Sequence, residues 1–598
     1  MTKLILLYSN LADEATLKIK KLSRQMRLLS LARLVTFLGI VVSPFLFLPH
    51  HLPLGVLISV VSIMLFLLFV KWHLKLQRNR HFQGCVLKVN EQELHALEYQ
   101  FSDFDPGSEF VNPKHRNSYD LDMFGDGSVF QFLNRTVTVG GKKMLAFFLQ
   151  SPLRNKYDIE ERQSFVKELA VNYNWRQHYM AQGMMYEESA DESDIFQKWS
   201  NEVFSLKFLR FIMPLKYFLY AFSLFAVVFW IVYSNSAFFM LSVVMQITLW
   251  LFNKKNIQKA YAEFGKRARL LSKYGTLLRE IENAGWKSTE GAGWIEALNK
   301  GGSPSHEISR LRKIVSAFDN RNNFLMGAIL NVLFLWDLNC TCRLIKWHSK
   351  NRDKYELWGK AIAHTDAMVS IANLSFNHPG YTFPEIVDSD FNIDARELGH
   401  PLILPDKRVD NQFTYDENTG VMIITGANMA GKSTFLRTLG VNMVLGACGA
   451  PVCASLFKFK PVEVYTNMRT TDSLVDDESY FFAELKRIKK ILDEIEKGKE
   501  LFIILDEILK GTNSVDKLSG SQQLIRRLVD ENAKVVIATH DLKLTEMESE
   551  YPDKLRNKCF EIEIINNELK FDYLLRDGVT SVMNATFLMK KMGIVKSL

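Results

Sequence analysis

The stretch Gly420–Thr434 reads GVMIITGANMAGKST and decides the fold of the C-terminal part of the chain. Its apolar first half is typical of a buried strand. The pattern G-x-x-x-x-G-K-[ST] comes next, and a segment that favours a helix follows it. In this pattern backbone N–H groups wrap nucleotide phosphates, the lysine reaches the β- and γ-phosphates, and the next hydroxyl binds Mg²⁺. The sequence therefore predicts an α/β P-loop NTPase domain that binds ATP and Mg²⁺. The predicted nucleotide-binding residues are Gly426, Ala427, Asn428, Met429, Ala430, Gly431, Lys432, Ser433 and Thr434.

Two further apolar strands end in residues that suit phosphate chemistry. ELFIILDE ends in Asp506 and Glu507, and AKVVIATH ends in His540. Asp506 and Ser433 are the predicted Mg²⁺ ligands, with Asp506 acting through water. Glu507 would polarise the attacking water, and His540 would sense the γ-phosphate. The predicted activity is ATP hydrolysis, with Glu507, Lys432 and His540 as catalytic residues.

A third motif, LSGSQQ at Leu518–Gln523, resembles the signature of membrane-transport ATPases. In those transporters the signature precedes the acidic strand, because it begins the helix that faces the partner's nucleotide. Here it follows Asp506 by twelve residues (518 − 506). This order argues against a transporter and predicts the capped start of an ordinary helix.

Four apolar runs indicate a membrane. They form two pairs, Leu34–Leu48 with Leu54–Val70 and Tyr217–Tyr233 with Ala237–Phe252, and each is about 15–17 residues long. A spanning helix needs roughly 17–25 residues, so a pair of buried helical hairpins is the alternative. The placement of charge favours the membrane, because the connectors between paired runs hold no lysine or arginine. The basic residues that flank the runs are Lys18, Lys20, Lys21, Arg24, Arg27, Arg33, Lys71, Lys75, Arg78, Arg80, Lys207, Arg210, Lys216, Lys254 and Lys255.

This charge pattern predicts four transmembrane helices in two hairpins that enter and leave on the cytoplasmic side. The predicted location is the inner (cytoplasmic) membrane, multi-pass, with the soluble domains in the cytoplasm. A further apolar stretch at 324–338 contains Asn331 and Asp337, which favours a buried helix over a fifth span.

Composition agrees with a large, reduced, multidomain protein. The 598 residues exceed one hydrophobic core, and 47% hydrophobic with 23% charged residues excludes a disordered chain. The net charge of +8 is weak evidence for an anionic partner, and the six cysteines show no zinc-ligand spacing. We expect five segments: a basic helix and first hairpin (1–80), a linker and start of the core (81–210), a second hairpin (211–253), an all-α lever or core domain (254–375) and the ATPase domain (376–598).

Taken together, the motifs resemble the MutS family of DNA mismatch-repair ATPases. TGANMAGKST and LDEILKGTNSVD are similar to the family's P-loop and acidic strand, and ATHDLKLTEME to its histidine strand. TTDSLVDDESYFFAEL resembles the segment that crosses the family's dimer, with Ser479, Phe481 and Glu484 at matching positions. LDMFGDGSVFQFLNRTVTVGGKKML resembles the start of its core domain, and ELGHPLI at Glu397–Ile403 the entry to its ATPase domain. The resemblance covers roughly 118–205 and 355–598.

The resemblance implies a homodimer in which Ser479 contacts the partner's γ-phosphate, and helical levers that bind double-stranded DNA. Two departures in the P-loop, Ala427 and Ala430, should be tolerated, whereas Tyr480 replaces a threonine beside Ser479. The N-terminal mismatch-reading domain, whose Phe-x-Glu wedge stacks on a mispaired base, has no counterpart in 1–80. We therefore expect DNA binding without strong mismatch preference.

Two functions remain open at this stage. The first is a membrane-anchored MutS-like ATPase, a conformational switch with DNA binding. The second is a membrane-bound nucleotide-dependent switch or scaffold without DNA recognition. A basic stripe on the levers would separate them. Its candidate residues are Lys254, Lys255, Lys259, Lys266, Arg267, Arg269, Lys273, Arg310, Arg312 and Lys313.

Overall fold

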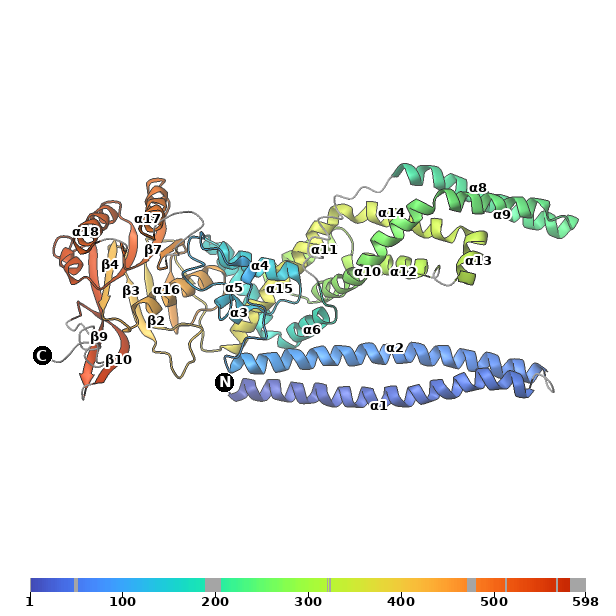
Figure 1. Ribbon diagram of the computed structural model, residues 1–598, viewed down its shortest axis with the longest axis horizontal. Helices are drawn as coiled ribbons and strands as arrows, with labels where there is room; N and C mark the ends of the chain where they lie inside the picture. Colours follow the sequence, from blue (N-terminus) through green and yellow to red (C-terminus); the bar gives the residue numbers. More distant parts are fainter. Residues whose placement is uncertain are drawn as a thin grey trace.

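The computed structural model describes residues 2–47, 52–188, 206–319, 321, 324–469, 480–510, 513–565 and 568–580. An α/β domain lies at one end of the elongated molecule, and a helical body lies in the middle (Figure 1). Two helical arms extend from the body in the same direction, away from the α/β domain (Figure 1).

The first arm is a pair of very long helices, α1 (Thr2–Phe47) and α2 (Leu52–Leu97), which pack against each other. Each has 46 residues and is therefore about 69 Å long. The predicted basic helix and the predicted span are thus one continuous helix in α1. The expected segment boundary at residue 80 falls inside α2, whose last turns pack against α6 (Tyr173–Met184) in the body.

The second arm consists of α8 (Leu206–Tyr233) and α9 (Ala237–Phe252), with α13 (Phe324–Phe334) packed against α9. On α13 the side chains of Ile329, Leu333 and Phe334 are 54%, 43% and 52% exposed. The prediction of a buried helix at 324–338 is therefore wrong for this apolar face of α13. Leu335 and Leu338, which follow, are buried as predicted.

Three described helices are long and apolar enough to cross a membrane, in the ranges Thr2–Leu46, Pro53–Leu97 and Arg210–Tyr233. The number rises to five when two bent pairs are each counted as one span. The helix α9 has 16 residues and qualifies only together with the start of α10, across a bend of 58°. Four spans in two hairpins are therefore not confirmed.

The body is helical and is organised around the buried helix α15 (Tyr355–Asn377). Asp366 on α15 accepts hydrogen bonds from Val137 N and Thr138 N, and Gly141 lies so close that a Cβ there would be 2.1 Å from Asp366 Oδ2. The close contact packs α4 against α15. The other helices of the body are α3 (Val129–Leu133), α4 (Val139–Gln150), α5 (Lys156–Val171), α10 (Lys254–Glu282), α11 (Thr289–Asn299), α12 (Pro304–Asp319) and α14 (Trp336–Asn351), with short 3₁₀ turns at Ser108–Phe110 and Arg352–Lys354.

The α/β domain contains a six-stranded sheet of order β10-β9-β4-β8-β7-β6. All neighbours are parallel except β10, which runs antiparallel to β9. Its strands are β4 (Val421–Gly426), β6 (Glu463–Asn467), β7 (Leu501–Asp506), β8 (Lys534–Thr539), β9 (Leu555–Ile565) and β10 (Glu568–Asp577). A smaller sheet of order β1-β5-β2-β3 joins it, with strands β1 (Glu385–Ile386), β2 (Ile393–Leu398), β3 (Asn411–Tyr415) and β5 (Leu456–Phe459). The predicted α/β domain is present.

Three helices and a 3₁₀ turn complete this domain: α16 (Lys432–Ala447), α17 (Tyr480–Glu496), α18 (Ser514–Asp530) and Leu542–Glu548. Asn513 caps α18 by accepting hydrogen bonds from Val515 N and Asp516 N. The helix therefore starts one turn before Leu518, and the prediction that LSGSQQ begins a helix is wrong by that turn.

Candidate functional site

The P-loop connects the central strand β4 to α16, with the geometry that its sequence predicts. Gly431 has φ 105°, and a Cβ there would lie 3.2 Å from the ring of Tyr573, so only glycine fits without strain. Ala427 and Ala430 are buried, and neither is among the described residues with positive φ. Alanine at these two positions therefore adds no backbone strain, as expected.

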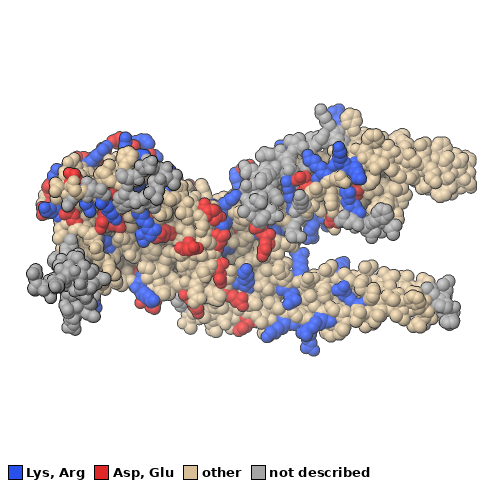
Figure 2. Space-filling model, in the orientation of Figure 1, with Lys and Arg blue, Asp and Glu red and all other residues tan. Residues whose placement is uncertain are grey.

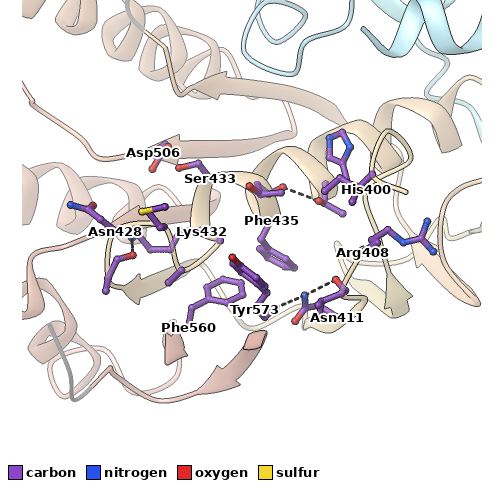
Figure 3. A pocket seen from close by; sticks show the side chains of 18 of the residues that line it. His400, Arg408, Asn411, Asn428, Lys432, Ser433, Phe435, Asp506, Phe560 and Tyr573 are labelled. Atoms are coloured by element: carbon purple, nitrogen blue, oxygen red, sulfur yellow. Dashed lines mark hydrogen bonds between the residues drawn. The ribbon is translucent and has the colours of Figure 1, made fainter. Parts of the chain in front are cut away.

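A cavity of about 560 Å³ lies over the P-loop (Figure 3). Its lining includes every predicted nucleotide-binding residue of 427–434, together with Asp506, Glu507 and His540. Gly426 contributes indirectly, because its carbonyl accepts a hydrogen bond from Lys432. Ser479 lies outside the described residues. The structure thus brings together, at one sheet edge, predicted residues from the ends of three strands.

Lys432 lies almost fully buried above the loop. Its Nζ donates hydrogen bonds to the carbonyls of Gly426 (2.7 Å) and Ala427 (3.0 Å), and lies 3.3 Å from His540 Nε2. Burial lowers the pKa of Lys432 to about 8, although the charges of Asp506 and Glu507 act in the opposite direction. An anionic phosphate in the cavity would favour the charged ammonium and restore a higher pKa.

Glu507 and His540 form a close pair, with 2.8 Å between Glu507 Oε1 and His540 Nε2. The hydrogen bond with His540 lowers the pKa of Glu507 to about 2, against the effect of partial burial. Glu507 has φ 52°, a conformation that is uncommon for a side chain of this kind. Its position is fixed by its N–H, which donates to Ala538 O on β8. The next turn is held by the buried Glu484, which accepts from Leu509 N at 2.6 Å.

Ser433 and Asp506 form the part of the site that suits Mg²⁺. Figure 3 shows their side chains pointing toward one another at the start of α16 and the end of β7. Hydroxyl and carboxylate oxygens are the hard donors that Mg²⁺ takes, and it usually keeps several waters and substrate phosphate oxygens as well. These two residues therefore fit the predicted metal.

The opposite wall of the cavity was not predicted from the sequence. It contains His400, Arg408, Asn411, Phe560 and Tyr573 (Figure 3). Asn411 fixes the loop of β10 by donating to Tyr573 O (3.0 Å) and accepting from Leu575 N (2.7 Å). His400 lies in the ELGHPLI motif, which was a signal for this wall. Tyr573 lies outside every motif.

A second unpredicted feature anchors the chain on both sides of the segment that carries Ser479. The buried Asp120 accepts hydrogen bonds from Thr466 Oγ1 (2.6 Å), Arg469 N (3.0 Å) and Arg487 Nη2 (2.7 Å). Thr466 and Arg469 precede the segment, and Arg487 on α17 follows it. A carboxylate of the body thus fixes both ends of a segment of the α/β domain.

This fold and this cavity define a P-loop nucleotide-binding domain on a helical body. Comparison with known proteins gives the family: MutS domain V matches residues 422–592 and MutS domain III matches residues 111–204. The DNA mismatch repair protein MutS of Acetivibrio thermocellus is 30% identical over 38% of this chain and 27% of its own length. The MutS protein of Ruminiclostridium cellulolyticum is 32% identical over 34% of this chain and 24% of its own length. The MutS protein of Ehrlichia chaffeensis is 29% identical over 48% of this chain and 34% of its own length.

Residues 111–204 and 422–592 therefore match two domains of the MutS family. The alignments span only about a quarter to a third of the length of these curated relatives. The two matched domains include the P-loop, the acidic strand, the histidine strand and the start of the body. Both arms fall mainly outside the matched residues.

The low pKa of Lys432 predicts a pH dependence of ATP binding. Bound phosphate raises that pKa from about 8, so above pH 8 binding takes up a proton and becomes weaker as the pH rises. If binding takes up one proton, the Kd for ATP rises by at most about tenfold for each pH unit. The measurement is calorimetric titration of full-length protein in detergent between about pH 7 and 9.5. Lys432→Arg is the control, because its guanidinium stays charged and should give a flat profile. A flat wild-type profile would contradict the assignment.

Proposed function

We propose that this protein is a membrane-attached ATPase that uses ATP binding and hydrolysis as a conformational switch. The observation that carries the proposal is the convergence of Lys432, Asp506, Glu507 and His540 on one cavity over the P-loop. Lys432 would leave its two carbonyl partners and pair with the β- and γ-phosphates. The N–H groups of the loop and of the first turn of α16 would hold the remaining phosphate oxygens.

Glu507 would orient and polarise the attacking water. The hydrogen bond with His540, which lowers the pKa of Glu507, keeps this side chain as the carboxylate that such a contact with water requires. Its partner His540 also lies next to Lys432, so a phosphate that displaces Lys432 also alters the Glu507–His540 pair. When bound through Ser433 and Asp506, Mg²⁺ would neutralise developing charge on the phosphate oxygens.

We further propose that the active form is a homodimer in which Ser479 completes the partner's site. The family resemblance assigns this role to Ser479. The anchors on both sides of its segment support the proposal, because Asp120 and Glu484 fix the flanking chain within the same protomer.

The arms support attachment to a membrane. Both carry many exposed leucine, valine, phenylalanine and isoleucine side chains, which a soluble protein would bury. Figure 2 shows lysine and arginine on the parts of both arms nearest the body, and almost none on the outer parts. Both arms point in the same direction, so one bilayer could hold both (Figure 1).

The catalytic part of the proposal is tested with Glu507→Gln in full-length protein. We expect ATP to bind tightly and hydrolysis to fall by ~10²–10⁴-fold, the usual loss for a catalytic base. Retained nucleotide is measured by filter binding, phosphate release by a coupled assay, and dimer formation by light scattering with ATP. Glu531→Gln, an exposed carboxylate of the same domain, is the control and should behave as wild type. Wild-type hydrolysis by Glu507→Gln would refute the role of this residue.

Membrane attachment is tested by cysteine labelling in intact cells. All six natural cysteines are buried, so introduced surface cysteines can be labelled selectively. We expect Ser234→Cys, at the tip of the second arm, to react with a membrane-impermeant maleimide from outside. Asn418→Cys, exposed on the α/β domain, should react only after permeabilisation. Labelling of Asn418→Cys from outside would overturn the proposed topology.

Double-stranded DNA is the second candidate partner, because the relatives reported above are DNA mismatch repair proteins. The predicted basic stripe is only partly available. Lys254, Lys255 and Lys259 are exposed on α10, whereas Lys273 is buried and donates to Val137 O and Glu188. Arg267 pairs with Glu263. The side chains of Lys266 and Arg269 lie outside the described residues.

Any DNA binding should depend on phosphate contacts. We expect affinity to fall steeply with salt and to differ by less than ~1 kcal/mol between mismatched and matched duplex, below the usual cost of one wrong base pair. The measurement is fluorescence anisotropy with homoduplex, mismatched and branched DNA across a salt series. A tenfold preference for a mismatch at physiological salt would show that a base-reading element is present.

A further inference from the structure

A basic groove lies between α12 and α14, on the part of the body next to the second arm. Its rim is formed by five cationic side chains, and its floor by the buried Ile314 and Trp347, around a volume of about 320 Å³. The five rim residues are Arg310, Lys313, Arg343, Lys346 and Lys350. Lysine and arginine are gathered over this part of the molecule in Figure 2.

The charge of this basic groove is largely uncompensated. Lys350 pairs with Glu307 at 2.7 Å, and none of the other four rim residues forms an ion pair within the described part of the chain. On each helix they recur at intervals of three or four residues, so like charges lie on one face and repel each other. An anion in the groove would relieve this repulsion.

The position of the groove identifies the kind of anion. The helix α14 begins at Trp336, directly after α13 with its exposed apolar face. Arg343 is seven residues further on, so the groove begins about 10 Å from that apolar face. A headgroup layer is about 5–8 Å thick, so if α13 lies against hydrocarbon the near end of the groove lies at the outer edge of this layer, from which long arginine and lysine side chains reach lipid phosphates.

We propose that the basic groove binds the phosphate of an anionic phospholipid, with the glycerol and upper acyl chain over Ile314 and Trp347. An apolar floor beneath a cationic rim fits an amphipathic ligand, whereas a DNA duplex presents phosphates without an attached apolar group. The proposal rests on the membrane attachment proposed above. It adds a specific lipid site and a means by which membrane composition can act on the body.

The test measures lipid binding separately from membrane insertion. Full-length protein in non-ionic detergent is titrated with phosphatidylglycerol or with phosphatidylcholine of the same acyl chains, and bound lipids are counted by native mass spectrometry. The groove variant is Lys313→Gln with Lys346→Gln. The control is Lys489→Gln with Lys490→Gln, two exposed lysines on α17 with the same loss of charge. ATP hydrolysis and thermal unfolding report whether each variant is folded.

We expect the groove variant to bind phosphatidylglycerol about tenfold more weakly or worse, because two cations near a lipid phosphate are lost. The control variant should bind it like wild type, and phosphatidylcholine should bind weakly to all three proteins. Equal phosphatidylglycerol affinity in wild type and groove variant would overturn the proposal.

Two further probes separate other anions. If inorganic phosphate displaces the lipid at similar concentration, the groove is a free-phosphate site and the lipid assignment is wrong. If the groove variant loses affinity for duplex DNA but not for phosphatidylglycerol, the groove is a DNA contact and the proposal is also wrong. Failure of membrane attachment would appear instead in the cysteine labelling, which these titrations do not use.

Discussion

The join between the first arm and the body depends on one buried carboxylate, Glu93. Arg135 Nε donates to Glu93 Oε1 and Asn377 Nδ2 donates to Glu93 Oε2, each at 2.7 Å, and Tyr8 Oη donates to Asn377 Oδ1. Buried charges are costly unless they are paired and hydrogen-bonded, and here both carboxylate oxygens have partners. One network therefore holds α1, α2, the start of the body and the end of α15. Any movement of the first arm at its base must move α15 or break this network.

A second polar junction continues from the body to the nucleotide site. Asp120 binds the end of β6 and Arg487 of α17, and Arg116 pairs with Glu463 at the start of β6. Because β6 is the edge strand beside β7, which ends in Asp506, a shift of the body against β6 would act on the direct neighbour of a strand that lines the candidate site. One hydrophobic core includes Val89 and Leu374, one turn from Glu93 and Asn377 on their helices, and Leu121, next to Asp120. If the proposed switch operates, coupling energies measured between the two junctions would show whether they are connected.

The sheet edge that carries the candidate site could be predicted from the sequence because its signals are local. A strand, a glycine-containing loop and a lysine adjoin in the chain, and the ends of parallel strands must meet at one edge. Tyr573, Asp120 and Arg487 could not be found in this way, because their contacts join residues far apart in the sequence. The predicted basic stripe failed in part for the same reason, because the pairing of Lys273 on α10 with Glu188 depends on tertiary packing.

The stretch at 324–338 shows how a polar residue can mislead. Asn331 suggested burial, yet its side chain donates to Gly327 O and accepts from Asp337 N, both at 2.9 Å. Asp337 in turn accepts from Trp250 Nε1 of the second arm. Asn331 is thus bonded within α13 and to the start of α14, and Asp337 faces the second arm, so the outer face of α13 remains apolar and exposed. A polar residue in an apolar run indicates that one face of the helix lies against the protein. It does not indicate whether the opposite face is buried or exposed.

The direction of the arms also constrains the proposed dimer. A closed dimer of identical subunits has a two-fold axis, and two copies in one bilayer must share the same orientation. The axis must then run along the membrane normal. Because both arms lie at one end of the molecule and the P-loop domain at the other, the two ATP sites would meet at a distance from the bilayer (Figure 1). Closure of that interface would change the lateral separation of the bodies, and the first arm, fixed through Glu93, would carry this change into the membrane plane.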